Sequence, residues 1–270
     1  MQPKIIFLGT GGARFVIANQ FRATGGIVLQ YDDEQIHIDP GPGTLIRAKQ
    51  YGIDLKNNTI LLVSHNHIDH CNDINAVIDV MTQGEITKKG ILITTKTIIQ
   101  GSKDETPYLT THHSKCVKRI IIAETGKITK INDLSVIPTK AKHDNTDSVG
   151  FKIITPKFTL GYTADTEYFR GIEKEYKGCD IMIINNLRSF GKKYKGHFSS
   201  AETVKLLQKV KPKLAIIQHF GMTMLKANPM YEAREITKQS GVQTVAATDG
   251  MHVDPISYSA RSHQKTLTGY

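Results

Sequence analysis

The chain has 270 residues and a formal charge of +10 at pH 7, with 39% hydrophobic and 22% charged residues. This composition is typical of a folded globular protein and excludes wholesale disorder. No apolar run approaches the roughly eighteen residues of a membrane span, and the first residues lack the apolar core and cleavage site of a signal peptide. We therefore expect a cytoplasmic protein without a membrane segment.

The charge is uneven along the chain. Residues 1–70 carry six basic and six acidic residues, so the whole basic excess lies in residues 71–270. A basic surface fits polyanionic partners such as nucleic acid, but a Lys-rich composition alone would produce the same excess. Three scattered cysteines are too few for a disulfide framework, which agrees with a reducing compartment.

Hairpin-like strands come first in the chain, and apolar runs then alternate with helical patterns. The expected strands are Lys4–Leu8, Gly26–Tyr31, Gln35–Asp39, Thr59–Val63, Gly90–Thr94, Arg119–Glu124, Lys127–Ile131, Leu134–Thr139, Gly150–Ile154, Thr159–Thr163, Ile181–Ile184, Leu214–Gln218 and Thr244–Ala247. The expected helices are Thr44–Tyr51, Asn72–Met81, Thr166–Tyr176, Ala201–Val210 and Met230–Gln239. This order predicts a layered α/β protein, with residues 1–270 in one domain and 257–270 as a flexible tail.

Ligand-type residues are concentrated directly after the apolar run Thr59–Val63. The chain continues Ser64-His65-Asn66-His67-Ile68-Asp69-His70. Alternate residues of an extended chain share a face, so His65 and His67 are expected to point the same way from a loop at a strand end. Imidazole and carboxylate groups are ligands of zinc and other first-row metals. The spacing therefore predicts a metal site.

Three more ligand-type residues follow apolar runs further along the chain. His143 comes after Leu134–Thr139, Asp165 after Thr159–Thr163, and His219 after Leu214–Gln218. Residues at the ends of strands can converge on one edge of a sheet. We expect these side chains to complete the site.

The stretch from His65 to His70 resembles the H-x-H-x-D-H signature of the metallo-β-lactamase superfamily, and His143, Asp165 and His219 follow in that superfamily's order. The opening Phe7-Leu8-Gly9-Thr10-Gly11-Gly12 and the run Asp39-Pro40-Gly41 also fit. The resemblance covers nearly the whole chain. It implies a four-layer αββα sandwich, in which helices flank two mixed β-sheets, with a dinuclear site at one edge.

The same resemblance implies a ligand set for two divalent metal ions. His65, His67 and His143 would hold the first metal, Asp69, His70 and His219 the second, and Asp165 would bridge them. Zinc is expected, with manganese and iron as alternatives. Two metals about 3.5–4 Å apart can share a bridging hydroxide and lower its pKa. Asp69 also counts among the catalytic residues, whereas Cys71, next to His70, receives no ligand role.

Two local features favour phosphodiester substrates. His197, in Gly196-His197-Phe198-Ser199-Ser200, resembles a histidine of the RNase Z group and of cyclic phosphodiesterases that lies near the scissile phosphate. The alternatives are a helix-capping role and a role in supporting the metal ligands from behind. The preceding loop contains Arg188, Lys192, Lys193 and Lys195 around Tyr194. Such a loop suits an anionic substrate, although a solvated surface loop would look the same.

One departure from RNase Z concerns the arm that this group inserts between two of its ligands. Only a hairpin fits between His143 and Asp165, so a cyclic nucleotide or cyclic phosphate competes with an RNA end as substrate. A basic segment (His112, His113, Lys115, Lys118 and Arg119) could act as a lid or platform.

The sequence thus predicts a cytoplasmic dinuclear metallohydrolase, a phosphodiesterase in first place. A lactonase or thioesterase on the same site is the alternative, and a nucleic-acid-binding protein without catalysis is the third reading. A homodimer is a further prediction.

Overall fold

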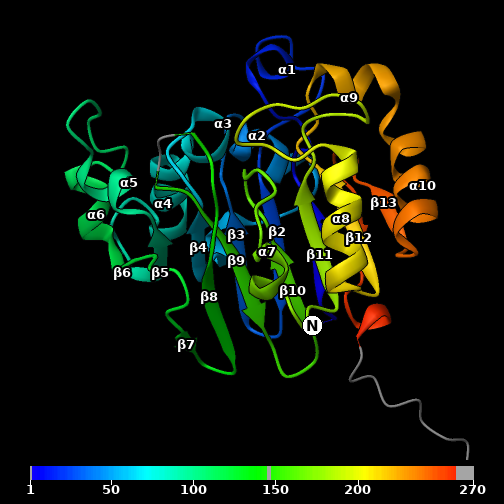
Figure 1. Cartoon of the computed structure of the whole chain (residues 1–270). Coiled ribbons are helices and arrows are strands. Elements are labelled where there is room, and N and C mark those ends of the chain that lie inside the picture. Colours follow the sequence, from blue (N-terminus) through cyan, green and yellow to red (C-terminus); the bar gives the residue numbers. More distant parts are fainter. Residues whose placement is uncertain (1, 145–146, 260–270) are drawn as a thin grey trace, which may run out of the picture.

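Two mixed β-sheets lie face to face in the computed structural model, which describes residues 2–144 and 147–259 (Figure 1). The first sheet runs β14 (His252–Val253), β1 (Lys4–Phe7), β2 (Ile27–Tyr31), β3 (Glu34–Ile38), β4 (Ile60–Val63), β5 (Lys89–Thr94) and β6 (Val117–Ile122). The second runs β13 (Thr244–Ala246), β12 (Leu214–Gln218), β11 (Ile181–Asn185), β10 (Thr159–Tyr162), β9 (Val149–Ile154), β8 (Leu134–Lys140) and β7 (Thr129–Ile131). Strands β3 to β6 are parallel, as are β10 to β13.

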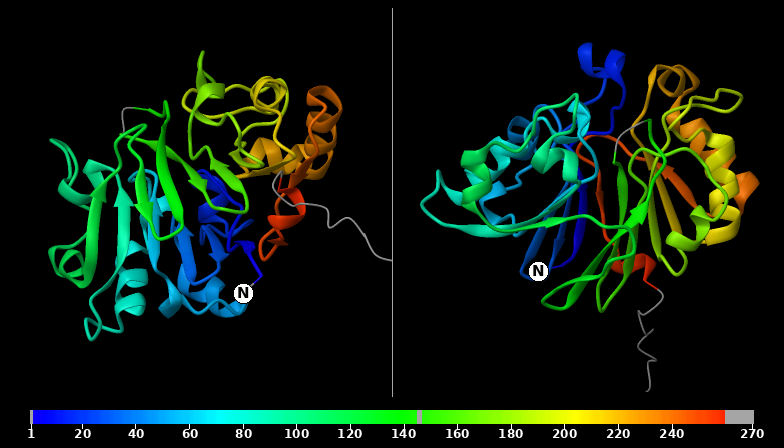
Figure 2. Two further views of the ribbon diagram at one scale, coloured as in Figure 1. Left: turned by 90° about the horizontal axis from the view of Figure 1, so that it is seen from below. Right: turned by 60° about the vertical axis from the view of Figure 1, so that its left-hand side comes forward.

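Helices cover the outer face of each sheet (Figure 2). Over the first sheet lie α2 (Thr44–Gln50), α4 (Ile74–Thr82), α5 (Lys96–Gln100) and α6 (Thr111–Cys116). Over the second lie α7 (Ile172–Glu175), α8 (Ser200–Val210), α9 (Met222–Ala227) and α10 (Pro229–Ser240). The short helix α1 (Arg14–Ala18) projects beyond the sandwich, and α3 (Ile68–Cys71) is a single turn after β4. Within the described ranges no helix has the length and apolar character needed to cross a membrane.

Three apolar layers hold these four structural layers together. The central layer joins the inner faces of both sheets, and the two outer layers join each sheet to its helices. Strand β1 shows how alternation builds this arrangement: Ile5 and Phe7 belong to the central layer, whereas Ile6 and Leu8 face the helices. The αββα sandwich expected from the sequence is confirmed.

The expected helix Thr166–Tyr176 is wrong over its first half, since only Ile172–Glu175 is helical. The Thr166 hydroxyl accepts a hydrogen bond from the Lys142 amide at 2.8 Å, and the Glu167 amide donates to the Lys142 carbonyl at 2.9 Å. The segment therefore pairs with the stretch after β8 instead of forming a helix. Helices α1, α5, α6 and α9 were not expected, because each is too short to show a helical period.

The predicted tail is described only up to Ser259. That residue is buried, and its carbonyl accepts a hydrogen bond from Lys213 Nζ at 2.9 Å. The tail beyond it lies outside the described residues.

Candidate metal centre

The first part of the site lies just beyond β4. His65 is fully buried, His67 precedes α3, and that helical turn carries Asp69 and His70. Ser64 anchors the loop, because its amide and its hydroxyl each donate to the Asp39 carboxylate at 2.7 Å. The histidines at 65 and 67 therefore lie in a short extended segment, and Asp69 and His70 lie in the helical turn that follows it.

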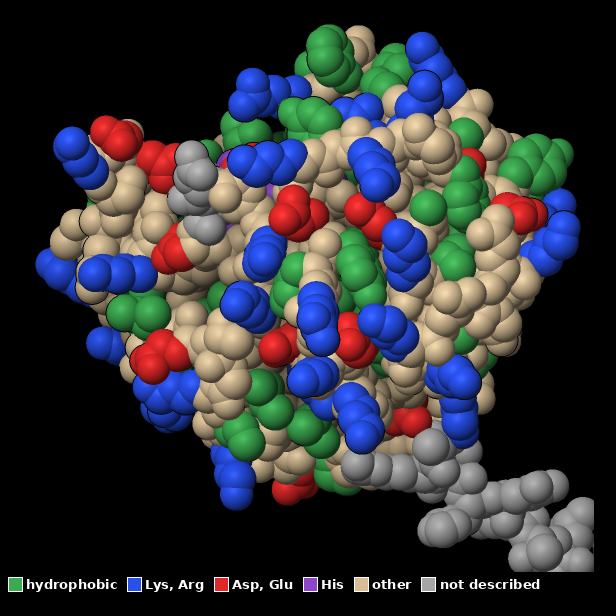
Figure 3. Space-filling model, viewed as in Figure 1, with side chains coloured by type: hydrophobic (Ala, Val, Ile, Leu, Met, Phe, Trp, Pro, Cys, Tyr) green, Lys and Arg blue, Asp and Glu red, His purple; other side chains and the backbone are tan. Residues whose placement is uncertain are grey.

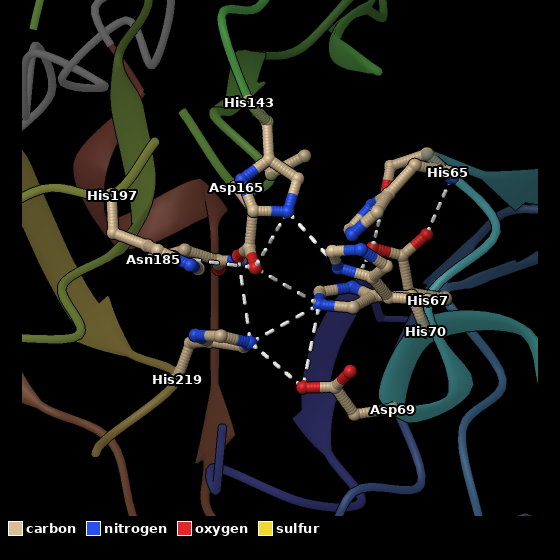
Figure 4. Close-up of polar contacts among 12 residues, drawn as sticks. His65, His67, Asp69, His70, His143, Asp165, Asn185, His197 and His219 are labelled. Carbon is tan, nitrogen blue, oxygen red and sulfur yellow. Dashed lines mark hydrogen bonds and ion pairs between the residues drawn. The ribbon is translucent and has the colours of Figure 1, made fainter. Parts of the chain in front are cut away.

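The second sheet supplies the opposite wall (Figure 4). His143 follows β8, Asp165 follows β10 and His219 follows β12; all three are buried. His143 Nε2 lies 3.0 Å from His67 Nδ1, and His219 Nε2 lies 3.1 Å from His70 Nε2. The ligand-type residues expected from the sequence are therefore brought together between the two sheets.

Their ligand atoms form two groups that meet at Asp165. One group contains His65, His67, His143 and Asp165, the other Asp69, His70 and His219; within each group the atoms lie within 4.8 Å of one another. Asp165 Oδ2 lies 3.4 Å from His70 Nε2, and Asp165 Oδ1 lies 3.4 Å from His219 Nε2. Asp165 is thus positioned between the groups.

Buried polar residues hold these side chains in place, and the sequence did not single them out as site residues. Asp39 Oδ2 lies 2.8 Å from His70 Nδ1 and also accepts from the Tyr162 hydroxyl at 2.6 Å. Asn185 Nδ2 donates to Asp165 Oδ1 at 2.7 Å. Of these residues only Asp39 belongs to a motif of the sequence, the run Asp39-Pro40-Gly41. Tyr162 and Asn185 each lie within an apolar strand, where their sequence context does not distinguish them.

A close backbone approach explains one glycine of the N-terminal loop. A Cβ atom on Gly12 would lie 2.3 Å from the His219 ring, so only glycine leaves room for this histidine. Asp249 holds the loop, because its carboxylate accepts from the Thr10 amide at 2.9 Å, the Thr10 hydroxyl at 2.7 Å and the Ala23 amide at 2.8 Å.

The charges of the site compensate one another. Burial opposes ionisation of Asp165, but His219, His70 and His197 around it hold its pKa well below its usual value. Burial alone would lower the pKa of His70, yet the Asp165 and Asp69 carboxylates raise it well above the usual value. Burial, followed by repulsion from His70, lowers the pKa of His65. The carboxylates therefore stay ionised, as ligands of a cation would be.

The donor set fits divalent metal ions. His65 Nε2 is buried and has no hydrogen-bond partner in the part of the chain that the structure describes. Facing imidazole nitrogens at 3.0 and 3.1 Å direct their lone pairs toward shared positions. Imidazole and carboxylate donors suit zinc, manganese and iron without selecting one of them.

His197 points into the cluster from the side opposite His65 and His67 (Figure 4). Its Nδ1 lies 3.5 Å from Asp165 Oδ2, and its ring stacks on His219 with 6.0 Å between centroids. Burial lowers the pKa of His197 to about 4, so the ring is neutral near pH 7. His197 does not cap α8, because the N-cap residue of this helix is Ser199, whose amide donates a hydrogen bond to the Glu202 side chain at 2.9 Å.

A cavity of about 550 Å³ opens onto the cluster. Asp165, His197 and Arg188 line it together with Tyr108 and residues of α1. Arg188 lies over the Tyr194 ring at 4.7 Å, and its buried Nε has no hydrogen-bond partner among the described residues. The basic loop thus contributes an arginine to the cavity wall.

Other basic residues noted in the sequence lie elsewhere. Lys192, Lys193 and Lys195 are exposed and do not line this cavity. The basic segment from His112 to Arg119 forms α6 and the start of the edge strand β6. Figure 3 shows Lys and Arg spread over one face with Asp and Glu between them.

Cys71 is buried and belongs to neither ligand group.

Comparison with known proteins gives a family. Residues 34–220 match the Beta-lactamase superfamily domain. An uncharacterized protein of Methanocaldococcus jannaschii is 30% identical over 94% of this chain and 96% of its own length. The ribonuclease Z of Methanopyrus kandleri is 24% identical over 92% of this chain and 88% of its own.

Solved structures share the fold. The metallo-β-lactamase fold protein YhfI of Bacillus subtilis superposes with a TM-score of 0.78 at 19% identity, covering 93% of this chain and 98% of its own. A diphosphatase of the PhnP family gives a TM-score of 0.67 at 18% identity, covering 93% and 97%.

Proposed function

This chain belongs to the metallo-β-lactamase superfamily, and from that premise we propose that it is a dinuclear metal-dependent phosphodiesterase. One observation carries the proposal beyond the family: His197 and Arg188 lie on the wall of the same cavity, with His197 3.5 Å from Asp165. A neutral imidazole N–H beside a cationic guanidinium is suited to binding an anionic phosphoester and to stabilising charge on its leaving oxygen.

The two ligand groups define where the metals would bind. His65, His67 and His143 would hold one ion, Asp69, His70 and His219 the other, and Asp165 would bridge them. The ions would supply Lewis acidity and a nucleophile at neutral pH. Zinc is our first choice, with manganese and iron as the other candidates.

The surrounding residues orient the ligands. Asp39 accepts a hydrogen bond from His70 Nδ1 and so orients the ring with Nε2 facing the cluster. Asn185 donates to Asp165 Oδ1 and restrains the carboxylate between the groups. Burial keeps water away from both contacts, which makes each hydrogen bond stronger than it would be in solvent.

At the substrate, Arg188 would bind a non-bridging phosphate oxygen, and the N–H group of the neutral His197 ring would donate a hydrogen bond to the departing oxygen. The stacking of Arg188 on Tyr194 holds the guanidinium plane at the cavity wall. This hydrogen bond would stabilise the negative charge that develops on the leaving oxygen, which would then take its proton from solvent. In our proposal Asp69 acts as a metal ligand and also as a catalytic residue, because it would position the nucleophile that the metal ions supply.

The substrate class is a nucleotide, a cyclic phosphate or an RNA end. One relative of this chain is the ribonuclease Z of Methanopyrus kandleri, which favours RNA as the substrate. However, His143 and Asp165 are separated only by the β9–β10 hairpin, which gives no long arm to grip a folded RNA. A 2′,3′-cyclic nucleotide would fit the cavity without such an arm. The cytoplasmic location and a homodimer stay predictions.

A substrate screen tests the proposal. Protein loaded with zinc or manganese is assayed against bis(p-nitrophenyl) phosphate, 2′,3′-cyclic nucleotides, RNA 3′ ends, a lactone and a thioester. We expect turnover of at least one phosphodiester. Turnover confined to the lactone or thioester would identify a carboxyl-ester hydrolase instead, and RNA binding without any turnover would identify a binding protein.

A further inference from the structure

Three ligand-type side chains also meet away from the candidate metal centre, on the helical side of the first sheet. Glu85 lies in the loop after α4, and His112 and Cys116 lie on α6. His112 Nε2 is 2.8 Å from Glu85 Oε1, and Cys116 Sγ is 3.7 Å from the same oxygen. The three ligand atoms lie within 4.8 Å of one another. We propose that Glu85, His112 and Cys116 form a peripheral site for a transition metal ion such as zinc.

The local structure explains how these side chains converge. Residues four apart share a helix face, so His112 and Cys116 present their side chains together. The Thr110 hydroxyl caps α6 by accepting from the His113 amide at 3.2 Å. After α4 the backbone takes left-handed conformations at Gln83, Gly84 and Glu85. This turn brings the Glu85 carboxylate back onto α6.

The geometry suits a tetrahedral ion with one open position. With Zn–N and Zn–O bonds of about 2.0–2.2 Å and a Zn–S bond of about 2.3 Å, ligand atoms of a tetrahedron lie roughly 3.3–3.6 Å apart. The observed 2.8 and 3.7 Å require shifts of about 0.5 Å or less, which the exposed Glu85 and His112 side chains can make. Water would be the fourth ligand.

The cysteine provides selectivity for soft metals. Cys116 is buried, 5% exposed, and lies behind the two exposed ligands. Burial and then the Glu85 carboxylate raise the pKa of its thiol. Binding of a divalent cation would release the thiol proton to solvent and leave a thiolate ligand. A thiolate with one imidazole and one carboxylate favours zinc or cobalt over magnesium or calcium.

This site would stabilise a segment that reaches the candidate metal centre. The stretch between α5 and α6 carries Glu105, which accepts a hydrogen bond from Asn66, and Tyr108, which lines the cavity. Asn75 of α4 also contacts this stretch, accepting from the Thr110 amide at 3.1 Å. A metal ion joining α6 to the loop after α4 would fix the end of this stretch.

Cobalt titration of the purified protein tests the proposal. The candidate centre offers only histidine and aspartate ligands, so a near-ultraviolet cobalt–thiolate charge-transfer band reports the peripheral site alone. We expect the final amplitude of this band in the wild type to correspond to one thiolate-bound cobalt ion per chain, reached by about three equivalents because the candidate centre would bind two further ions. Cys116→Ser should abolish it, and His112→Gln should weaken cobalt binding there by about tenfold or more. Zinc content after dialysis should fall by one ion per chain in Cys116→Ser.

Matched variants control for loss of folding and for other thiols. His113→Gln changes the neighbouring histidine on the same helix, and Cys179→Ala removes a buried thiol of the second sheet's helical layer. Both should keep the band and the full zinc content. A wild type without the band would overturn the proposal and leave Glu85 and His112 as a surface ion pair. A band that persists in Cys116→Ser or disappears in either control variant would overturn it as well.

Discussion

Asp39 connects the two sheets at the candidate metal centre through His70. Its Oδ2 atom lies 2.8 Å from His70 Nδ1 in the first sheet's ligand loop, and the same oxygen accepts from the Tyr162 hydroxyl in the second sheet at 2.6 Å. One carboxylate thus orients the ring of a candidate ligand histidine and fixes its position relative to the opposite sheet.

We predict that Asp39→Asn weakens zinc binding by about 10- to 100-fold, because the amide does not fix the His70 tautomer as the carboxylate does. Competition with a chromogenic chelator measures this affinity. Tyr162→Phe serves as the control: it removes one donor to Asp39 but keeps the contact with His70, so its loss should be smaller. Equal affinity of Asp39→Asn and the wild type would contradict this role.

Gly12→Ala tests the packing under His219. The added methyl group would lie 2.3 Å from the imidazole ring, so the ring must move and the second ligand group loses a member. We expect the loss of about one bound zinc ion per chain and of hydrolysis, with the circular dichroism spectrum unchanged. Gly43→Ala is the control, since a Cβ there meets no atom within 4 Å and costs only the strain of a positive φ. Full zinc content in Gly12→Ala would show that His219 is not a ligand.

His197→Ala should lower kcat for a phosphodiester by about 10²- to 10³-fold, because a positioned hydrogen-bond donor to the leaving oxygen is lost. Zinc content should not change, since His197 stands outside the proposed ligand set. Tyr194→Phe, which keeps the neighbouring ring, should retain activity. A loss of one zinc ion in His197→Ala would instead make His197 a ligand together with Asp165 and His219, whose atoms also lie close together.

Arg188→Ala should raise KM for a phosphodiester by about 10- to 100-fold, as expected when a charged hydrogen-bond donor to the substrate is lost. Lys193→Ala is the matched control from the same loop, because this exposed lysine does not line the cavity. Its KM should stay within about twofold at moderate salt. If both variants raise KM alike, the substrate is bound by the loop's overall charge and not by the cavity wall.

Acid should destabilise the protein through His37. This residue is fully buried in β3, and burial lowers its pKa to about 4, below the 6.5 of an exposed histidine. The unfolded chain therefore binds the extra proton as the pH falls from 6.5 to 4. The contribution of His37 to the free energy of unfolding should drop by about 1.4 kcal/mol per pH unit in this window and level off below it.

Thermal unfolding of the zinc-loaded protein between pH 4.5 and 7 measures this effect. His37→Gln keeps a donor for the Gly25 carbonyl, which lies 2.9 Å from His37 Nε2, but does not titrate. Its Tm should therefore depend less on pH than that of the wild type. His252→Gln, at an exposed histidine, should leave the slope unchanged. The same slope in His37→Gln and the wild type would rule out this contribution.

Much of the sandwich could be predicted from residue patterns. Buried strands such as β4 and β11 are nearly pure apolar runs, and α8 has both the apolar period and the Ser199–Glu202 pair at its start. Short helices could not be predicted, because one or two turns are too short to show the helical period of apolar residues. The irregular stretch after Asp165 was wrongly expected to be helical for another reason. The Thr166 side chain is hydrogen-bonded to Lys142, a partner 24 positions away that the local pattern does not reveal.

The residues of the candidate site also divide into those that the sequence pattern reveals and those that only the fold reveals. The residues that supply ligand atoms stand out, because histidine and aspartate at strand ends have few other uses. Asn185 and Tyr162 could not be found in this way, since an amide or phenol within an apolar strand looks like any other residue until the fold brings it to Asp165 or Asp39. Gly12 required the His219 ring to be located first.

The contact between Asp249 and the loop at Thr10 spans almost the full length of the chain. Strand β14 follows it and pairs with β1, where Val253 lies opposite Ile5. During translation the N-terminal glycine loop leaves the ribosome long before Asp249 is made. The cradle that admits His219 is therefore completed only after Asp249 has been synthesised, and a nascent chain stalled before that residue would lack a finished candidate metal centre.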